Sequence, residues 1–476
     1  MENEWPREAK EGYFLFAFLP FSRLRRKKQS KSRKRVPTPP FSPRKIKSIS
    51  STFFLYSGWP MENVYAVIDM KSFYASCECA ERGLDIFSTP LVVADPDRTE
   101  ATIVMSVTPY LKEKYGCSNV CRVKDLPHVP GMIFAKPRMR YYIEMSAKVV
   151  SIFLDFIDDC DLHVYSIDES FLNLGPYLSL YHCTAEELVA RIQKRIKEEL
   201  GLLATAGLGP NMFLAKICLD NEGKKRPPYL ARWYQKDVKE KLWSIRPITK
   251  IWGIAGGTSR HLAKMGIYSM EALAKTDPLL LKKEFGVMGQ ELHRLANGID
   301  ETDIREKYVP KERNLSCGQT LYRDYDRKGA RLLLREMTDD LCFRLRLAGY
   351  KAGCVSVFCG YSASSMVPGF SRQRSLDIRC DDNDILYDAV LGVFDEHVCA
   401  APIRHLGITF SSLSPYEAQQ YSLFESAEDL EERRRLYATM DDIQTIYGRN
   451  AVLRATSLTK DSTIRVKHTQ IGGHNA

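Results

Sequence analysis

Two short apolar stretches, far apart in the chain, each lead to acidic residues. Residues 64–68 are apolar or β-branched, as in a buried strand, and Asp69 follows them directly. Residues 163–172 alternate in a way that is typical of two short strands joined at a corner, and that corner is Asp168-Glu169. A compact sheet can bring such strand ends together. The sequence therefore allows three carboxylates to meet at one edge of a sheet.

Three neighbouring carboxylates repel one another unless cations lie between them. Two Mg²⁺ ions roughly 4 Å apart are a known arrangement for in-line displacement at phosphorus. The plainer interpretation is that Asp69 ends an ordinary strand and that Asp168-Glu169 forms an ordinary turn, because acidic residues are common in turns. Spacing alone favours this plainer interpretation. The choice between a metal site and an ordinary strand end and turn therefore depends on the surrounding residues.

Strand-like and helix-like segments alternate after residue 60. Residues 184–187 form a capping box for a helix whose apolar positions follow helical spacing up to Leu200. A strand is expected at 203–207, and a helix through 213–217 should follow it. This order predicts an α+β domain of ferredoxin-like type, interrupted by an insertion at 76–137.

The remaining chain predicts two further units and a tail. Residues 236–308 look helical and contain a Gly-rich turn at 252–258, whose backbone N–H groups can point at a phosphate. Residues 315–413 alternate strands with an amphipathic helix and predict a second α+β unit. From residue 414 on comes a tail with a short apolar element at 420–424 and a charged helix.

The formal net charge of +10 comes entirely from the N-terminal segment. Residues 1–60 contain 14 Lys and Arg against 4 Glu, and residues 61–476 carry 55 basic and 55 acidic side chains. Binding of a polyanion by the body of the protein would therefore need basic residues gathered on one face. We expect residues 1–60 to be a disordered basic extension, which is either a functional arm or a segment that the natural chain, starting at Met61, lacks.

The composition excludes several other classes of protein. No apolar run is long enough to cross a bilayer, and 44% apolar content over 476 residues allows several buried cores. The 13 cysteines are scattered without a C-x-x-C pair, which argues against zinc ribbons and a disulfide framework. We expect reduced, mostly buried thiols in a cytoplasmic protein with no membrane segment.

The residues around the acidic positions match two family signatures. Residues 68–78 read Ile-Asp-Met-Lys-Ser-Phe-Tyr-Ala-Ser-Cys-Glu, and residues 165–172 read Tyr-Ser-Ile-Asp-Glu-Ser-Phe-Leu. With these motifs the chain resembles the Y-family translesion DNA polymerases. Within that family it is most similar to the bacterial UmuC and DinB group, particularly the UvrX-like UV-damage-repair polymerases of Gram-positive bacteria. The resemblance covers residues 61–470 in the expected motif order.

The resemblance implies an α+β, multi-domain fold shaped as a right-hand polymerase. The palm would be ferredoxin-like, the fingers small, the thumb helical with a helix-hairpin-helix, and the little finger α+β. The implied bounds are 61–75 and 138–235 for the palm, 76–137 for the fingers, 236–308 for the thumb, 315–413 for the little finger, and 414–476 for a tail with a clamp-binding peptide.

The resemblance also implies the chemistry of the acidic corner. Asp69, Asp168 and Glu169 would be the catalytic carboxylates and would bind two Mg²⁺ ions, with the backbone carbonyl of Met70 as a further ligand. In such enzymes one ion lowers the pKa of the primer 3′-hydroxyl, and the other holds the triphosphate of the incoming dNTP.

Tyr74 stands at the family's steric-gate position, where its ring would leave no room for a 2′-hydroxyl. The implied nucleotide-binding residues are Phe73, Tyr74, Tyr110 and Lys216, with Lys224 or Lys225 as a weaker candidate.

The fingers depart from the family's commoner pattern at one position. Glu113 stands where an Arg is usual, three residues before the glycine of Lys114-Tyr115-Gly116. The missing positive charge has three candidate sources, which are Lys112, Lys114 and Arg122.

The resemblance places DNA and clamp contacts in the C-terminal half. The thumb hairpin would bind the DNA backbone through Gly253, Gly256 and Gly257. Ala255 replaces a glycine that is frequent in the family, and a positive φ at this position would strain the hairpin. Phosphate contacts in the little finger would come from Arg323, Arg344, Arg346, Arg372 and Arg374. The segment Gln420-Tyr421-Ser422-Leu423-Phe424 is similar to peptides that dock on the β sliding clamp, with Gln420, Leu423 and Phe424 as anchors.

The sequence thus predicts a monomeric, template-directed DNA polymerase of low fidelity that acts on primer-template DNA in repair or an SOS-type response. Two other classes remain open. A nucleotidyl cyclase also sets carboxylates around two metals on a ferredoxin-like palm but lacks the hairpin, the little finger and the clamp peptide. A catalytically silent DNA- or clamp-binding accessory protein could keep the fold, although three carboxylates kept together argue against it.

Overall fold

The computed structural model describes residues 63–475, except Pro96, Arg98, Thr99, Asn119, Val120, Tyr308, Lys311 and residues 417–426. The predicted extension at 1–60 and the clamp anchors Gln420, Leu423 and Phe424 lie outside the described residues. The chain divides into two compact units after Lys307.

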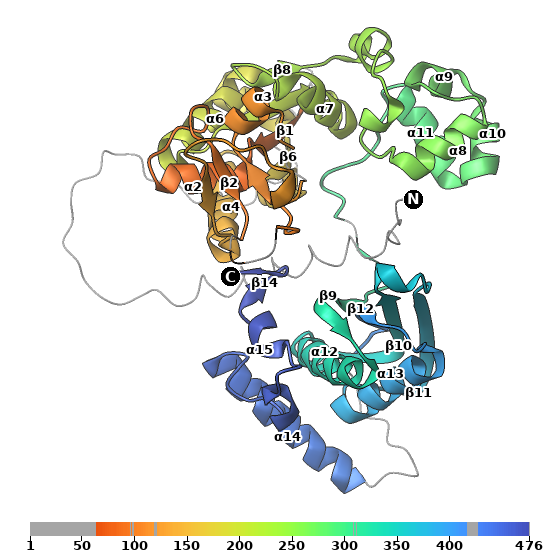
Figure 1. Ribbon diagram of the computed structural model, residues 1–476. Coiled ribbons are helices and arrows are strands. Elements are labelled where there is room, and N and C mark those ends of the chain that lie inside the picture. Colours follow the sequence, from red (N-terminus) through yellow and green to blue (C-terminus); the bar gives the residue numbers. More distant parts are fainter. Residues whose placement is uncertain are drawn as a thin grey trace. The chain divides into compact units, whose positions relative to one another are not determined.

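The N-terminal unit is built around a five-stranded sheet with the order β5-β6-β1-β7-β8 (Figure 1). β1 pairs antiparallel with both β6 and β7, and β8 runs parallel to β7. The predicted pair of strands joined at an acidic corner is β5 and β6, which are antiparallel neighbours. The strands are β1 (Tyr65–Met70), β5 (Leu162–Val164), β6 (Glu169–Asn173), β7 (Ala204–Gly209) and β8 (Leu230–Arg232).

The helices of this sheet domain begin where local sequence signals place them. In the predicted capping box of α6, the backbone N–H of Glu187 donates to Thr184 Oγ1 at 3.2 Å, and the Glu187 carboxylate accepts from the Thr184 N–H at 2.9 Å. α6 packs on β7 and on α4. The helices are α2 (Phe73–Glu81), α4 (Met139–Leu154), α5 (Gly175–Tyr181), α6 (Ala185–Leu200) and α7 (Met212–Cys218).

α7 lies unusually close to β7, and two glycines make this approach possible. A Cβ atom on Gly207 would lie 2.3 Å from the backbone nitrogen of Leu219, and one on Gly209 would lie 2.5 Å from that of Ala215. Either contact would push the helix away from the sheet. On the sheet side, Ala215 and Leu219 pack against Val67 of β1.

A small three-stranded sheet, with the order β3-β2-β4, lies in the segment predicted to be the fingers. β2 pairs antiparallel with β3 and parallel with β4, and its core includes Val92 and Leu111. The elements are β2 (Leu91–Val93), β3 (Ser106–Val107), α3 (Pro109–Tyr115) and β4 (Ile133–Ala135).

The helical region predicted to be the thumb shares a core with α7. Phe213 and Ile217 of α7 belong to the same apolar cluster as Leu262, Leu281 and Leu292. α7 therefore packs on the sheet with one side and on this helical region with the other. The helices are α8 (Gly256–Lys264), α9 (Met270–Lys275), α10 (Pro278–Phe285) and α11 (Val287–Ala296).

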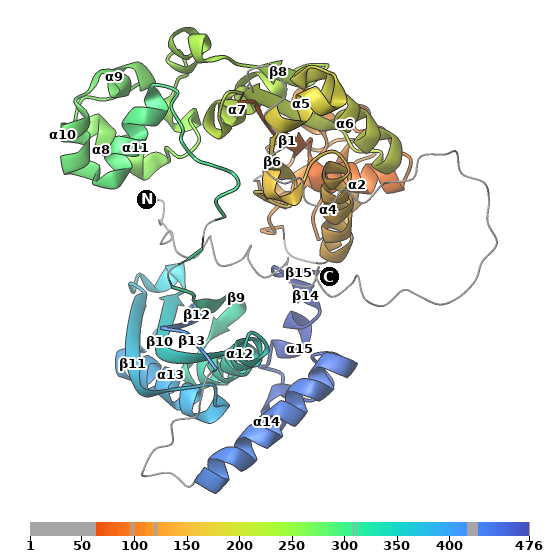
Figure 2. The same cartoon turned by 180° about the vertical axis from the view of Figure 1, so that it is seen from behind.

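The C-terminal unit contains a four-stranded antiparallel sheet with the order β11-β10-β12-β9, and the short strand β13 adds to β10. α12 and α13 lie against the strands on one side, as both views show (Figures 1 and 2), and bury one apolar core. The elements are β9 (Leu315–Tyr325), α12 (Arg327–Leu347), β10 (Tyr350–Tyr361), β11 (Phe370–Cys380), α13 (Asn383–His397), β12 (Ile403–Ser411) and β13 (Ser414–Pro415).

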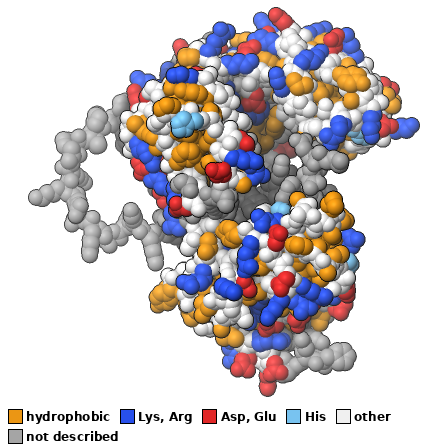
Figure 3. Space-filling view, viewed as in Figure 1, with side chains coloured by type: hydrophobic (Ala, Val, Ile, Leu, Met, Phe, Trp, Pro, Cys, Tyr) orange, Lys and Arg blue, Asp and Glu red, His pale blue; other side chains and the backbone are white. Residues whose placement is uncertain are grey.

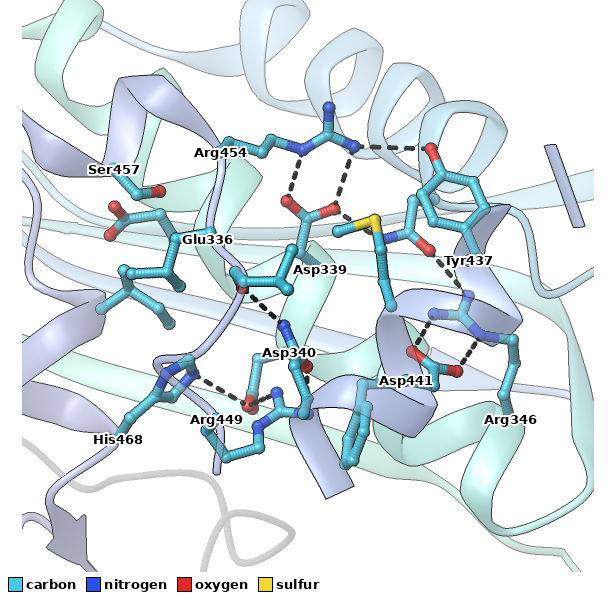
Figure 4. Close-up of a pocket in the computed structure, with 17 residues that line it drawn as sticks. Glu336, Asp339, Asp340, Arg346, Tyr437, Asp441, Arg449, Arg454, Ser457 and His468 are labelled. Atoms are coloured by element: carbon cyan, nitrogen blue, oxygen red, sulfur yellow. Dashed lines mark hydrogen bonds and ion pairs between the residues drawn. The ribbon is translucent and has the colours of Figure 1, made fainter. Parts of the chain in front are cut away.

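The tail folds back on α12 through ion pairs. Figure 4 shows Arg346 of α12 facing Asp441 of α14, with Nε–Oδ2 and Nη2–Oδ1 distances of 2.7 and 2.9 Å. Arg454 binds Asp339 at 2.8 Å, and Arg449 binds Asp340 at 2.7 Å. The tail elements are α14 (Ala427–Tyr447), α15 (Ile464–Lys467), β14 (Gln470–Ile471) and β15 (His474–Asn475).

The prediction of a multi-domain protein of mixed helices and sheets is confirmed. The finer division into palm, fingers, thumb and little finger stays a prediction. Among the residues that the structure describes, no helix is long and apolar enough to span a membrane.

Removing the Asp441 carboxylate should loosen the tail. In Asp441→Ala, the largely buried Arg346 keeps only neutral acceptors, the carbonyl of Asp381 and the side chain of Asn383. We expect the docking of α14 to weaken by about 2–3 kcal/mol, since a buried charge loses its partner. Hydrogen exchange of the α14 amides should become faster, whereas Asp442→Ala, at the next and exposed position, should leave it unchanged. Equal exchange in both variants would contradict this role of the pair.

Candidate active site

The acidic corner lies where β1 ends beside the start of β6. Asp69 is directly opposite Glu169, and the backbone N–H of Met70 donates a 2.9 Å hydrogen bond to the carbonyl of Asp168. Directly paired residues have side chains on the same face of a sheet. Asp69 and Glu169 therefore share the face of Val67, against which α7 packs. The structure brings the three acidic residues together at one end of two neighbouring strands.

Two lysines from α7 and the turn after it neutralise this corner. Lys216 Nζ lies 2.7 and 2.8 Å from the two carboxylate oxygens of Glu169, and Lys224 Nζ lies 3.0 Å from Asp69 Oδ2. Asp220 links the lysines at 3.2 Å from Lys216 and 3.0 Å from Lys224. These five residues form an alternating chain of charges from Glu169 to Asp69, which we call the acid–lysine chain.

Burial dominates the electrostatics of the corner. Desolvation raises the pKa of the Asp69 carboxyl to about 7, because Lys224 offsets only part of it and the charges of Asp168 and Glu169 add repulsion. Burial also raises the pKa of Glu169, with Lys216 opposing. For Lys224, burial lowers the pKa, but Asp69 and Asp220 outweigh it and hold the pKa above its ordinary value.

The donor atoms of the corner suit a hard divalent cation. Carboxylate oxygens are ligands that Mg²⁺ prefers, and a cation here would relieve the repulsion around Asp69. Within the described residues, no three Asp, Glu, His or Cys side chains already converge as a metal cage. Lysines contact Asp69 and Glu169, and Ser166 Oγ donates to Asp168 at 2.6 Å. The residue types fit magnesium, while their contacts in this structure are with protein groups.

α2 starts directly after β1 and carries the two predicted sugar-binding aromatic residues. Phe73 is buried, and its ring centre lies 5.6 Å from that of the partly exposed Tyr74. Burial, followed by the charge of Asp168, raises the pKa of Tyr74 to about 12. Tyr74 thus lies close enough to the acidic corner to respond to its charge.

Tyr74 is braced by residues that sequence reasoning missed. Its ring centre is 4.7 Å from that of Tyr142 on α4, and the Tyr142 hydroxyl donates a 2.8 Å hydrogen bond to the fully buried Glu78. Arg138 binds the same carboxylate through two hydrogen bonds of 3.0 Å. The sequence signal that could have revealed these contacts was Glu78, an acidic residue one helical turn after Tyr74 on an otherwise mostly apolar helix.

Tyr110, the residue predicted to contact the nucleotide from the fingers, is bound within its own helix. The Tyr110 hydroxyl accepts a 3.0 Å hydrogen bond from Lys114, and this contact with the lysine lowers the pKa of Tyr110. The Arg122 guanidinium donates to the carbonyl of Ala101 at 2.6 Å. Lys114 and Arg122 are thus engaged by groups of the fingers segment.

Lys112 is the candidate whose pKa depends on the charges around the acidic corner. Burial lowers its pKa, as do the charges of Lys71 and Lys224, while Asp69 opposes. Glu113, the departure from the family pattern, is exposed. Of the three candidates for the missing positive charge, Lys112 is thus the one whose pKa responds to Asp69.

The glycine-rich hairpin begins α8 without strain at Ala255. Gly253 has a φ of 88°, which favours glycine, whereas Ala255 has the extended values φ −87° and ψ 176°. The concern that alanine would strain this turn is therefore wrong. Gly256 and Gly257 form the first turn of α8, where backbone N–H groups have no partner within the helix.

Several arginines predicted to contact DNA are engaged within the C-terminal unit. Arg346 is bound by Asp441 as described above, Arg323 pairs with Asp461, and Arg344 donates to the carbonyl of Ser316 at 3.2 Å. The expectation that Arg346 is free for phosphate is wrong for this arrangement, because its guanidinium is mostly buried against α14.

Arg372 and Arg374 lie on the edge strand β11, opposite Val357 and Val355 of β10. Those valines belong to the core under α12 and α13, so both arginines project toward the helix-covered side, where Arg374 pairs with Glu396 at 2.5 Å. The opposite, open face carries small polar residues that sequence reasoning missed, and these include Ser316, Thr320, Ser356, Ser371, Gln373 and Thr409.

Basic and acidic side chains are mixed over the visible surface. On the face seen in Figure 3, Lys and Arg side chains are interspersed with Asp and Glu over both units. This agrees with the formally neutral charge of residues 61–476.

Comparison with known proteins decides the family. The model of the impB/mucB/samB family matches residues 68–220, and that of the family's C-terminal domain matches residues 312–423. A Bacillus subtilis (strain 168) protein named for UV-damage repair, UvrX, is 35% identical over 422 residues, covering 88% of this chain and 99% of that protein. DNA polymerase IV 2 of the same organism is 32% identical over 416 residues, covering 87% and 99%. DNA polymerase IV of Pelotomaculum thermopropionicum is 30% identical over 400 residues, covering 83% and 96%.

The chain belongs to the impB/mucB/samB family. The resemblance drawn from the two acidic motifs is confirmed, and the chain is a Y-family translesion DNA polymerase. Neither the nucleotidyl cyclase nor the silent accessory protein is favoured by these relatives. The first family match covers the end of β1, the corner and α7, and it includes every member of the acid–lysine chain except Lys224.

Neutralising Asp69 should stabilise the magnesium-free protein. A carboxyl whose pKa rises from 3.8 unfolded to about 7 folded weakens the fold most above pH 7, and this penalty fades as the pH falls from 7 toward 4. Asp69→Asn should therefore raise the free energy of unfolding at pH 8 by roughly 2 kcal/mol, and by clearly less at pH 5. Urea unfolding followed by tryptophan fluorescence measures this, since all 5 tryptophans precede Lys307. A less stable variant at pH 8 would show that the Asp69–Lys224 pair is net stabilising.

Proposed function

We propose that Asp69, Asp168 and Glu169, with the carbonyl of Met70, hold two Mg²⁺ ions at which a dNTP is joined to a primer 3′ end. The observation that carries this proposal is the meeting of three acidic residues at the end of β1 and β6. When bound, the ions lower the pKa of the primer hydroxyl and screen the triphosphate. The raised pKa of Asp69 supports it, because burial, and after it the charges of Asp168 and Glu169, disfavours the carboxylate, which a bound cation would stabilise.

Among the lysines, we propose Lys224 as the main triphosphate contact and Lys216 as a holder of Glu169. The Lys216 side chain is 8% exposed and sits between two carboxylates, whereas that of Lys224 is 33% exposed beside Asp69. The Lys224 ammonium is the more exposed of the two, so a phosphate can reach it more easily. Lys112 and Tyr110 would complete the contact from the fingers segment.

Tyr74 would act as the steric gate, with Phe73 beside it. Support comes from its place near the start of α2, five residues after Asp69, and from the packing of Tyr142 against its ring, which restricts where it can move. A ring held in this way can exclude a 2′-hydroxyl by contact rather than by hydrogen bonding.

Template-primer DNA would be held through its backbone. The amides of Gly253, Gly256 and Gly257 begin a helix, and the open face of the C-terminal sheet offers hydroxyl and amide groups that can bind phosphates without reading sequence. Arg344 of α12 and Arg372 of the edge strand stay proposed phosphate contacts on the helix-covered side of the sheet, away from its open face. Arg346 and Arg374 are left out, because their guanidinium groups are bound to carboxylates.

We further propose a cytoplasmic monomer that works in an SOS-type response and tolerates distorted templates because its fingers segment is small. Gln420, Leu423 and Phe424 would dock on the β sliding clamp, and this rests on the pentapeptide pattern alone.

Primer extension tests the proposed metal ligands. Asp168→Asn should lower the rate of extension by at least about 100-fold, because one of the carboxylates that would hold the ions is lost. Asp442→Asn, an exposed acid of α14, should extend primers like the wild type. Chelation of Mg²⁺ should stop both enzymes. Extension by Asp168→Asn at the wild-type rate would refute the assignment.

The fingers lysines give a second test. Lys112→Ala should raise the KM for dNTP by about 10-fold, since one charge near the triphosphate disappears. Lys114→Ala, two residues along the same helix and bound to Tyr110, should change this KM by less than about threefold. Single-nucleotide incorporation at varied dNTP concentration measures both, and the opposite ranking would move the contact to Lys114.

A further inference from the structure

One side chain beside the acidic corner contacts both ends of a basic loop. The loop is Lys224–Tyr229, with the sequence Lys-Lys-Arg-Pro-Pro-Tyr, and it links the acid–lysine chain to β8. Lys71 Nζ donates a 3.1 Å hydrogen bond to the backbone carbonyl of Lys224, and it lies 4.7 Å from the ring centre of Tyr229. A single ammonium thus joins the two ends of this loop.

The Tyr229 end of the loop is fixed to the sheet. The Tyr229 carbonyl accepts hydrogen bonds from the Ala206 N–H at 2.8 Å and from Gln193 Nε2 at 3.1 Å. Its φ of 59° is rare for a bulky residue and shows that these contacts hold the backbone in place. The ring also lies parallel to that of Phe87, with 6.4 Å between the ring centres.

The Lys224 end has one backbone anchor of its own and its charged side chain. The Lys224 N–H donates to the carbonyl of Leu219 at 3.0 Å, and its ammonium contacts Asp69 and Asp220. Between the ends, residues 225–228 are exposed. If a triphosphate draws the Lys224 ammonium away from Asp69, Lys71 becomes the side chain that still ties the Lys224 backbone to the end of β1.

The surroundings of Lys71 favour holding over direct binding. Its side chain is about half buried, and burial lowers its pKa while Glu113 and Asp69 oppose that change. The Lys71 ammonium already contacts the carbonyl of Lys224 and the ring of Tyr229. A cation placed in this way holds other groups in position.

We propose that Lys71 is a positioning residue for the nucleotide: it fixes the backbone of Lys224 and thereby places the Lys224 ammonium for the triphosphate. This inference rests on the proposed triphosphate role of Lys224. It assigns a function to the third residue of the motif that begins at Asp69, and it makes the basic loop part of the nucleotide site.

A double-mutant cycle on single-nucleotide incorporation tests the proposal. Lys71→Met keeps the apolar stem and removes the donor, so the KM for dNTP should rise about 5- to 10-fold while kcat stays within about threefold. Lys71→Arg keeps a cation and a donor and should restore the KM to within about threefold of wild type. Lys148→Met, at an exposed position of α4, is the control.

The cycle separates positioning from direct contact. If Lys71 acts through Lys224, Lys71→Met should add nothing in a Lys224→Ala background. Additive increases in KM would show that Lys71 acts independently and would overturn the proposal, as would an unchanged KM in Lys71→Met alone. An unchanged KM in Lys224→Ala would instead remove the proposed role of Lys224, and the inference with it.

Partial misfolding does not imitate the expected result, because a smaller active fraction lowers kcat and leaves KM unchanged. Should Lys71→Met fail to fold, Tyr229→Leu removes the contact at the other end of the loop. It should raise KM in the same direction and should likewise be non-additive with Lys224→Ala. A KM equal to wild type in Tyr229→Leu would then count against the proposal.

Discussion

The burial of neighbouring carboxylates is the constraint on which the rest of the N-terminal unit depends. Asp69 and Glu169 are paired across two strands, and their charges cannot be placed there without neighbouring cations. The structure supplies Lys216 and Lys224, which Asp220 connects. The site's own lysines therefore offset part of its negative charge, and any added cation or triphosphate has to rearrange these pairs.

α7 makes this balance possible, because it carries Lys216 and leads into the turn that carries Lys224. Its close approach to β7 requires the missing side chains at Gly207 and Gly209. Its opposite side packs into the helical region that contains the glycine-rich hairpin. One short helix thus couples the acidic corner to the region proposed to hold DNA, and a change in its position would reach both.

In the C-terminal unit, charge has two different uses. Arg346 of α12 pairs with Asp441 of the tail, and Arg449 of the tail pairs with Asp340 of α12 (Figure 4), so these arginines act as structural contacts. The open face of the sheet presents hydroxyl and amide groups at several of its paired positions, together with Phe358 and His405. Hydroxyl and amide groups can bind a phosphate backbone by hydrogen bonds with little long-range attraction.

The sequence by itself determined the local structure and the family. The apolar run before Asp69, the acidic corner and the capping box at Thr184 depend on neighbouring residues, so each could be predicted from its pattern. The partners of single charges could not be. Arg346 and Arg372 look alike along the chain, but one is bound by Asp441 and the other lies on an edge strand. Lys71, Lys216 and Lys224 likewise differ only in what faces them. Those partners come from distant segments, and strand register and helix packing choose them, so only the tertiary structure decides which charges hold the fold and which remain for a ligand.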